Sequence, residues 1–294
     1  MTEDMGSTVP RRQLGRTLKQ LRAEAGVTLD ATADALECSR QKIWRIESGL
    51  AVVRAVDVRA MCGLYDVRTD LVTALVGLAS QTRAKGWWHA YGDAIPEWFE
   101  LYVGLESAAS RLRYFKDALL PGIVQTRDYA LGMYRTDQPE MSEDGRARAV
   151  EARLQRQSLL TRRLPPAPSV ELVLSEAALL RPVSDRQVMA GQLAHLLTLA
   201  ELPNVVIRVL PLAAGHHRGS LAGSFIILDF PPGNRNTPEP PIVYCESLTG
   251  ALYLDRPVEY AAYEKVWASL DALALDEGQS RSMINKILGE MQHD

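Results

Sequence analysis

The feature that most constrains this fold is a run of three short helical segments between residues 13 and 49, each with its own start and stop signals. The first, QLGRTLKQLRAEAG, repeats apolar side chains at helical spacing and ends at Gly26, a C-cap residue. Thr28 is an N-cap for a second short helix. Ser39 caps a third, RQKIWRIES, which stops at Gly49. Three short helices with a tight turn between the last two predict a helix-turn-helix.

The third segment has an apolar side and a basic side. A helical projection places Ile43 and Ile46 together, away from Arg45. The stretch SRQKIWRI carries three basic residues and no acidic one, although the whole chain has a net charge of −3. Such a surface would contact the phosphates and base edges of DNA. Taken alone, a basic amphipathic helix more often has a charged face that is simply solvated. The basic charge therefore indicates DNA binding only together with the surrounding sequence pattern.

The line LKQLRAEAGVTLDATADALECSRQKIWRIESG resembles the lambda-repressor-like, or xenobiotic-response-element-type, regulators, and the resemblance covers residues 13 to 80. It implies that the start of the third helix reads bases in the major groove of double-stranded DNA and that neighbouring residues meet the backbone. Arginine pairs with guanine and glutamine with adenine through two hydrogen bonds, so these residue types suit the task. The implied DNA-binding residues are Thr28, Ser39, Arg40, Gln41, Lys42, Trp44 and Arg45.

The same resemblance gives two further expectations. Arg22 and Glu47 occupy positions that form a structural ion pair in such domains, tying the first helix to the end of the third. Trp44 departs from the family, which generally has a smaller or polar residue there; its ring either touches a sugar or a thymine methyl group or belongs to the core. Two more helical segments, VDVRAMCGLYDV and TDLVTALVGLA, complete a five-helix domain.

Beyond residue 80 the pattern changes twice. Helical spacing dominates from 97 to 163, and the six arginines between 146 and 163 are interpreted as a solvated helix face. The period then becomes two in SVELVLS, NVVIRVLP, SFIILDF and PIVYCES, with a helix from about 185 to 202. The first two strands and that helix predict a parallel βαβ unit, and the next two strands predict antiparallel additions. Two helices follow, from about 258 to 275 and from 279 to 291.

The predicted fold class is therefore α+β with several domains, since 294 residues exceed a single DNA-binding module. We expect a disordered tail at residues 1–10 and a five-helix, lambda-repressor-like helix-turn-helix domain at 11–80. A linker at 81–95 leads to a larger regulatory domain at 96–294, which combines a helical bundle with a small sheet.

The second region resembles the C-terminal domain of WhiJ-like regulators of actinomycetes over most of residues 87 to 291. The segments that carry this resemblance are WFELYVGLESAASRLRYF, LLPGIVQTRDYA, EARLQRQSLL, LSEAALLRP, LPNVVIRVLPL and IVYCESLTGALYLD. It implies a domain that senses a small molecule or a small partner protein, the latter in an arrangement likened to antitoxin and toxin. The resemblance transfers no catalytic residue.

The sequence contains no catalytic, cofactor or metal motif. His216 and His217 stand close to Ser220 in GHHRGSLAGSF, but the G-x-S-x-G elbow of hydrolases is absent. Adjacent histidines on a strand point to opposite sides, and neither metal-ligand spacing nor a G-x-G-x-x-G or P-loop signature occurs. We expect no enzyme, no cofactor and no metal, and a hairpin connection at this loop; an enzyme fused to a DNA-binding domain ranks last.

The remaining features place the chain in the cytoplasm. Cys38, Cys62 and Cys245 are far apart and odd in number, which favours reduced thiols. No apolar run approaches the ~18 residues that a membrane span requires. The leading hypothesis is a ligand- or partner-responsive transcriptional regulator, acting as a homodimer whose recognition helices lie about 34 Å apart. The alternative is an antitoxin-like protein that sequesters a small partner and regulates its own operon.

Overall fold

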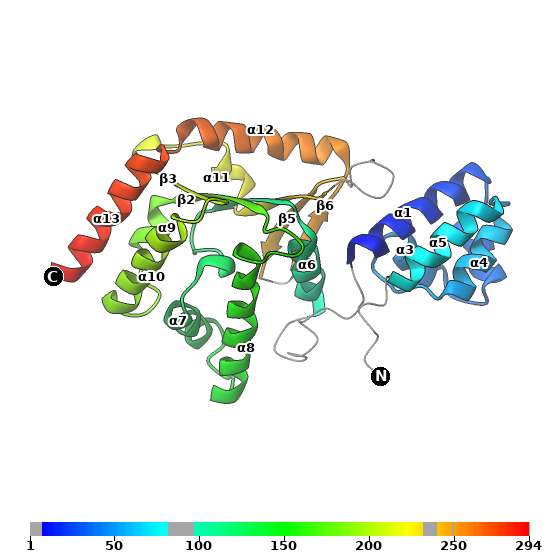
Figure 1. Ribbon diagram of the computed structural model, residues 1–294, viewed down its shortest axis with the longest axis horizontal. Helices are drawn as coiled ribbons and strands as arrows, with labels where there is room; N and C mark the ends of the chain where they lie inside the picture. Colours follow the sequence, from blue (N-terminus) through cyan, green and yellow to red (C-terminus); the bar gives the residue numbers. More distant parts are fainter. Residues whose placement is uncertain (1–7, 82–96, 232–239, 249, 294) are drawn as a thin grey trace. The chain divides into compact units, whose positions relative to one another are not determined.

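The computed structural model describes residues 8–81, 97–231, 240–248 and 250–293. The chain divides into two compact units, Met1–Gly92 and Asp93–Asp294. In the described part of the chain, the first unit consists of helices, and the second contains a sheet with helices on both of its faces (Figure 1). The predicted fold class is confirmed: a helical helix-turn-helix unit precedes a larger α+β unit.

The helices of the first unit enclose one apolar core. They are α1 (Thr8–Glu24), α2 (Leu29–Ala35), α3 (Arg40–Glu47), α4 (Ala55–Leu64) and α5 (Thr69–Gln81). Each of α1, α3 and α4 contributes fully buried side chains to this core, namely Leu14, Leu18, Ile43, Ile46 and Met61. Short helices such as α2 and α3 are marginal in isolation, so burial of their apolar faces holds them in place.

The capping residues seen in the sequence are the ones that the structure uses. Thr28 Oγ1 accepts a hydrogen bond from the Ala31 backbone N–H at 3.1 Å, and Ser39 Oγ accepts one from the Lys42 N–H at 3.2 Å. Gly49, just after α3, has a φ of +71°, a left-handed conformation that glycine adopts without steric cost. The predicted run of three helices and its turns is confirmed.

The first helix starts earlier than predicted. It begins at Thr8, so residues 8–10 of the expected tail are helical. Pro10 does not prevent this, because a proline in the first turn removes a backbone N–H that no helical carbonyl would accept. The rest of that tail, residues 1–7, lies outside the described residues, and so does the expected linker at 81–95, apart from Gln81 at the end of α5.

The strands of the second unit form one mixed sheet in the order β3-β2-β1-β4-β5-β6. They are β1 (Arg111–Lys116), β2 (Ser169–Ser175), β3 (Val205–Leu210), β4 (Phe225–Asp229), β5 (Ile242–Ser247) and β6 (Gly250–Leu254). Strand β2 pairs in parallel with both β1 and β3, and α10 (Arg186–Leu199) connects β2 to β3. Strands β4, β5 and β6 add in antiparallel fashion. The predicted parallel βαβ unit and the antiparallel additions are confirmed.

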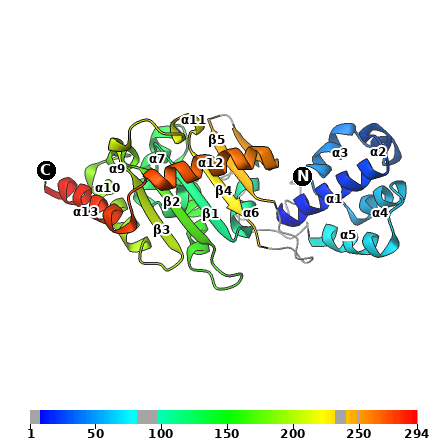
Figure 2. The same ribbon diagram turned by 90° about the horizontal axis from the view of Figure 1, so that it is seen from above.

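Helices cover the two faces of this sheet. On one face α12 (Pro257–Leu273) packs Trp267 and Leu270 against Phe115, Val173 and Phe225 of the strands. On the opposite face lie α6 (Glu97–Ala108), α7 (Arg127–Asp137) and α8 (Glu143–Gln155) (Figures 1 and 2). Helix α13 (Glu277–His293) packs against α10 and β3. The short elements are η2 (Gly122–Val124), η3 (Arg156–Leu160), α9 (Glu176–Leu180), η4 (Leu212–Ala214) and α11 (Gly219–Ala222).

The main error of the sequence prediction is β1. The segment RLRYFK was read as helix, but it is a strand in the middle of the sheet. Tyr114 faces α6, where its hydroxyl contacts Glu106, and Phe115 belongs to the cluster under α12. The strand is buried on both faces and includes Arg113, whose charge is neutralised by carboxylates of other elements, so the polar-apolar alternation from Arg111 to Tyr114 does not separate an exposed face from a buried one.

Three smaller corrections concern the same unit. The arginines between 146 and 163 are not all solvated, because Arg146 and Arg156 are buried. The GHHRG loop is not a hairpin connection, because it joins β3 to β4, which lie on opposite sides of the β2–β1 pair. Strand β6 was not predicted; it is a short edge strand with no fully buried side chain among the described residues.

Candidate nucleic-acid interface

Helix α3 is divided into a buried side and an exposed side. Ile43 and Ile46 are 0% and 1% exposed in the core of the first unit. The side chains predicted to meet DNA bases or phosphates are exposed, namely Ser39, Arg40, Gln41, Lys42, Trp44 and Arg45. Because the buried isoleucines fix the rotation of the helix, the three basic residues lie on the side that remains open to a partner.

Trp44 belongs to the exposed side and not to the core. It is 51% exposed, between Lys42 and Arg45 in sequence. This exposure excludes the interpretation that Trp44 is a core residue, because a core side chain would be shielded from solvent. An exposed indole next to basic side chains has the size and polarity to contact a sugar or a thymine methyl group.

The N-termini of α2 and α3 contain two of the residues that are predicted to contact the DNA backbone. Thr28 and Ser39 are both exposed N-cap residues, and each uses its hydroxyl oxygen to accept a backbone N–H of its own helix. The partial positive charge of a helix N-terminus favours phosphate oxygens. The N-terminus of α3 therefore attracts a phosphate group, whereas Asp30 places a negative charge in the first turn of α2.

Arg40 has a partner that the sequence reading missed. Its guanidinium lies 3.5 Å from a carboxylate oxygen of Asp30, and both side chains are more than 60% exposed. Exposed pairs of this kind contribute little free energy, so Asp30 orients Arg40 without holding it firmly. The only sequence signal for this contact was an acidic residue in the first turn of the preceding helix.

Arg22 and Glu47 support the interface from behind. Arg22 donates to both carboxylate oxygens of Glu47, at 2.6 and 2.9 Å, and also to the Val27 carbonyl at 2.9 Å. The hydrogen bond to Glu47 raises the pKa of Arg22, so the guanidinium stays charged. These residues join α1, the turn before α2 and the end of α3, and they contribute no exposed group to the interface.

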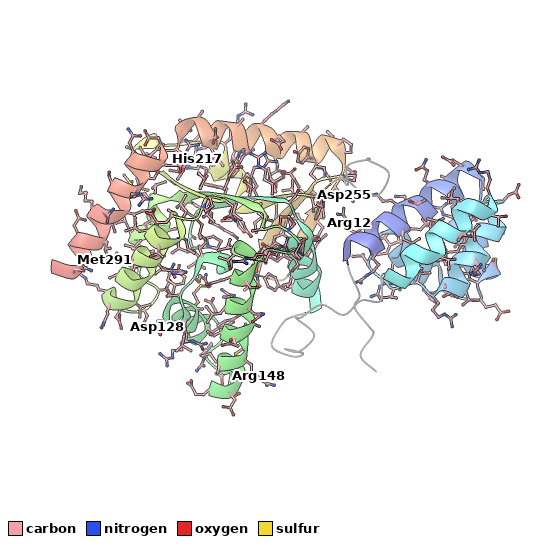
Figure 3. All side chains as sticks on the ribbon, in the orientation of Figure 1. Arg12, Asp128, Arg148, His217, Asp255 and Met291 are labelled. Carbon is pink, nitrogen blue, oxygen red and sulfur yellow. The ribbon has the colours of Figure 1, made fainter. Side chains whose placement is uncertain are left out.

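The loop with the paired histidines lies in the second unit. His217 lies just before α11 (Figure 3), with its ring edge-on to Phe115 at 5.8 Å between centroids. His216 is exposed. Within the described ranges, no group of three or more His, Cys, Asp or Glu residues is arranged to hold a metal ion. None of the described helices is long and apolar enough to cross a membrane.

Two family models match the chain. One, described as a helix-turn-helix domain, matches residues 13–75 and so covers α2, α3 and α4. The other, described as a domain of unknown function, DUF5753, matches residues 99–286, more than half of the chain. The chain belongs to the DUF5753 family. No curated protein matches it in sequence.

The two family matches give different amounts of functional information about the two units of this DUF5753 protein. The helix-turn-helix match, together with the geometry of α3, makes the chain a DNA-binding regulator of the helix-turn-helix class. The DUF5753 match contains the whole sheet and most of the surrounding helices, but its description assigns no ligand or activity to them. The function of the second unit must therefore be argued from its own residues.

Proposed function

We propose that this DUF5753 protein is a cytoplasmic, sequence-specific transcriptional regulator of the WhiJ-like type, which binds double-stranded DNA as a homodimer. The observation that carries the proposal is the division of α3, whose isoleucines are buried while its basic residues and Gln41 are exposed. A basic helix face held by a core supplies the phosphate attraction that gives affinity and the side chains that read base edges.

Individual roles follow from residue type and position. Gln41 and Arg45 read adenine and guanine in the major groove, and Arg40 joins them once a phosphate or base replaces Asp30 as its partner. Lys42, Ser39 and Thr28 contact phosphates near the two helix N-termini. Trp44 makes an apolar contact with a sugar or a thymine methyl group.

The DUF5753 domain senses a small molecule or a small partner protein and acts by binding, not by catalysis. Binding of its ligand changes the fraction of dimers in which the two recognition helices match half-sites about 34 Å apart. Such a shift requires only that the ligand bind one arrangement more tightly than the other.

One observation favours the antitoxin-like alternative, in which the chain sequesters a small partner and regulates its own operon. The second unit has large apolar side chains at its surface, among them Leu212, Leu221, Leu248 and Leu252, all at least 59% exposed. Exposed apolar groups mark a protein-binding surface where they are contiguous, and Leu248 and Leu252 belong to the same β5–β6 hairpin. Stable co-purification with the product of an adjacent gene would favour this alternative over a small-molecule sensor.

Selection from random DNA duplexes tests the proposal. The full chain should enrich a palindromic sequence with half-sites about one helical turn apart, and its affinity should fall steeply as salt is raised. Enrichment of no sequence, with equal affinity for all duplexes at physiological salt, would contradict it.

A further inference from the structure

Lys116 is the last residue of β1, the strand at which the order of the sheet reverses. Strands β2 and β3 lie on one side of β1, and β4, β5 and β6 lie on the other. In open α/β sheets, small ligands bind outside the carboxyl ends of the strands at such a reversal. Because side chains alternate along a strand, Lys116 lies on the same face as Tyr114, whose hydroxyl donates to Glu106 of α6. Lys116 therefore lies where the topology favours a ligand.

No direct contact within the described residues neutralises the charge of Lys116. The side chain is half-buried, and its ammonium group forms no hydrogen bond or ion pair with any of these residues. Burial lowers the pKa of Lys116, the charge of Glu246 raises it, and the charges of Arg156 and Arg153 lower it. Because Glu246 is exposed, water and salt screen its attraction. Lys116 is therefore partly shielded from water while it lies near other cations.

Arg153 on α8 is a second cation that is bound by neutral groups. It donates to Gln125 Oε1 at 2.8 Å and to the Tyr134 hydroxyl at 3.2 Å, and it forms no ion pair in the described part of the chain. A guanidinium has five N–H donors, so donors remain for a ligand. Arg156 differs, because Glu106 neutralises it. The repulsion between the half-buried charges of Lys116 and Arg153 is costly, and a bound anion removes that cost.

Tyr244 on β5 gives an independent observation. Its side chain is 1% exposed, yet its hydroxyl group has no hydrogen-bond partner among the described residues. Its ring lies 4.3 Å from that of Tyr102 on α6, so Tyr244 is on the face of the sheet that also carries Lys116. The charges of Glu246 and Arg156 act on the pKa of Tyr244 as well as on that of Lys116. A buried hydroxyl without a partner is costly, and a ligand that supplies an acceptor removes that cost.

We infer that Lys116, Arg153 and Tyr244 bind a small molecule that carries one phosphate monoester group. Such a group has a charge of about −1.5 to −2 at pH 7, which matches the two cations. Both cations donate charge-assisted hydrogen bonds to the phosphate oxygens, and the Tyr244 hydroxyl donates to a further oxygen of the ligand. Glu246 repels a longer polyanion, so the site favours a single phosphate group over a nucleic-acid backbone.

The inference rests on the proposed function, because it identifies the phosphate compound as the effector that the second unit senses. Titration calorimetry of the full chain tests it with inorganic phosphate, glycerol 3-phosphate and glucose 6-phosphate. Glucose is the uncharged counterpart of the last compound, and succinate is a dianion whose two charges lie several bonds apart. At least one phosphate compound should bind with a one-to-one stoichiometry, more weakly at high salt. Succinate should bind more weakly than that compound, and glucose should not bind.

Three variants locate the site. Lys116→Gln should weaken phosphate binding roughly tenfold or more, because one of the two cations is lost. Tyr244→Phe should weaken it roughly threefold or more without lowering the unfolding temperature, since its hydroxyl has no hydrogen bond to lose. The matched control is Lys265→Gln, which changes an exposed lysine of α12 on the other face of the sheet and should leave binding unchanged.

The inference is overturned if no phosphate compound saturates the chain, if glucose or succinate binds as tightly as the phosphate compounds, or if Lys116→Gln binds them as tightly as the original chain. Equal weakening by Lys116→Gln and Lys265→Gln would also overturn it, in favour of non-specific attraction. A phosphate compound that binds without changing DNA affinity contradicts the effector role. Failure of phosphate binding with intact DNA binding leaves the proposed function standing, whereas failure of DNA binding with intact phosphate binding removes the proposed function instead.

Discussion

Arg22 and Glu47, 25 positions apart in the sequence, form a two-pronged ion pair that joins α1 to the last turn of α3. The Glu47 side chain is 3% exposed and that of Arg22 14% exposed, so the pair is shielded from water. We expect Glu47→Gln to lower the free energy of unfolding of the first unit by about 2 kcal/mol, because charged hydrogen bonds are lost while the guanidinium stays shielded. Hydrogen exchange in α1 and α3 measures this.

The matched control is Glu290→Gln, which removes an exposed contact with Lys286 at 3.9 Å. That change should alter stability by less than about 0.5 kcal/mol. Equal effects of the two substitutions would show that the shielded pair does not stabilise the first unit.

Gly15 sets how closely α1 approaches α3. A Cβ atom at this position would lie 2.4 Å from the Ile46 carbonyl oxygen and 2.8 Å from that of Glu47. Neither backbone oxygen can move without displacing α3, so Gly15→Ala should destabilise the first unit by roughly 1–3 kcal/mol despite the better helix propensity of alanine. Gly63→Ala, in α4 with nothing within 4 Å of its Cβ, should be neutral or stabilising. Chemical denaturation distinguishes the two; a harmless Gly15→Ala would mean that the helices do not pack this closely.

Glu106 and Arg156 form an ion pair in the interior of the second unit. Arg156 donates to both oxygens of Glu106, at 2.8 and 2.7 Å, and the hydroxyls of Tyr102 and Tyr114 donate to the same carboxylate at 2.6 and 2.8 Å. Glu106→Gln should cost about 3–5 kcal/mol, because a guanidinium remains buried without its counter-charge. Adding Arg156→Met to Glu106→Gln should recover much of that loss in thermal unfolding, because no buried charge then remains, and no recovery would contradict this explanation.

The same pair makes stability depend on pH. Burial alone would raise the pKa of Glu106, but the charge of Arg156 and the hydrogen bonds that the carboxylate accepts hold this pKa below its usual value. A carboxylate with a lowered folded-state pKa stabilises fully above its unfolded value of about 4.3 and loses that contribution as the pH falls through the folded value. Unfolding measured down to acidic pH should show this loss in the original chain and a smaller one in Glu106→Gln.

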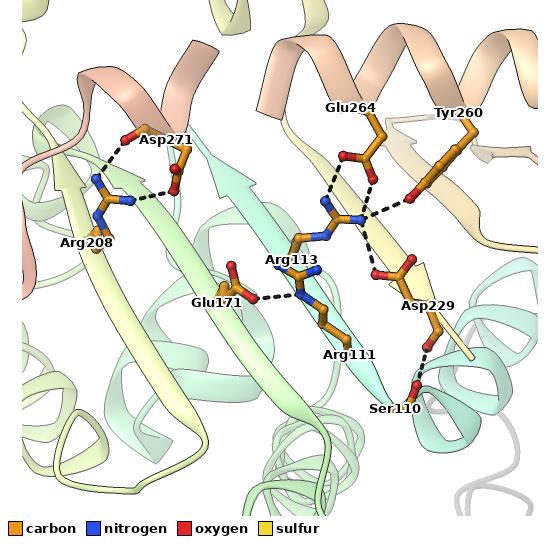
Figure 4. A network of polar contacts seen from close by, with 9 residues as sticks. All are labelled: Ser110, Arg111, Arg113, Glu171, Arg208, Asp229, Tyr260, Glu264 and Asp271. Atoms are coloured by element: carbon orange, nitrogen blue, oxygen red, sulfur yellow. Dashed lines mark hydrogen bonds and ion pairs between the residues drawn. The ribbon is translucent and has the colours of Figure 1, made fainter. Parts of the chain in front are cut away.

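Arg113 and Arg111, two residues apart on β1, differ sharply in environment. Arg113 is 3% exposed and binds both Asp229 and Glu264, whereas Arg111 makes a more exposed contact with Glu171 (Figure 4). Arg113→Met should cost roughly 2–4 kcal/mol because it leaves partly buried carboxylates unpaired, and Arg111→Met less than about 1 kcal/mol. Similar losses from the two variants in denaturant titrations would contradict the role assigned to Arg113.

Sequence patterns predicted the first unit well because its signals are local. A capping hydroxyl at Ser39, a glycine stop at Gly49 and apolar spacing each act within one or two turns of helix. Strand β1 could not be predicted in the same way, since its arginine is buried only because Glu264 and Asp229, more than 100 residues away, neutralise it. The contact between Asp30 and Arg40 and the grouping of Lys116 with Arg153 likewise depend on tertiary placement that no spacing reveals.

The central claim is that the exposed side of α3 reads DNA. Once a bound sequence has been selected, its affinity should be measured for the full chain and for Arg45→Ala, with Lys286→Ala in α13 as the control. We predict that Arg45→Ala costs about 1–3 kcal/mol of specific binding and relaxes the preference at one base pair, while Lys286→Ala changes neither. Undiminished affinity and specificity of Arg45→Ala would contradict the assignment of α3 as the recognition helix.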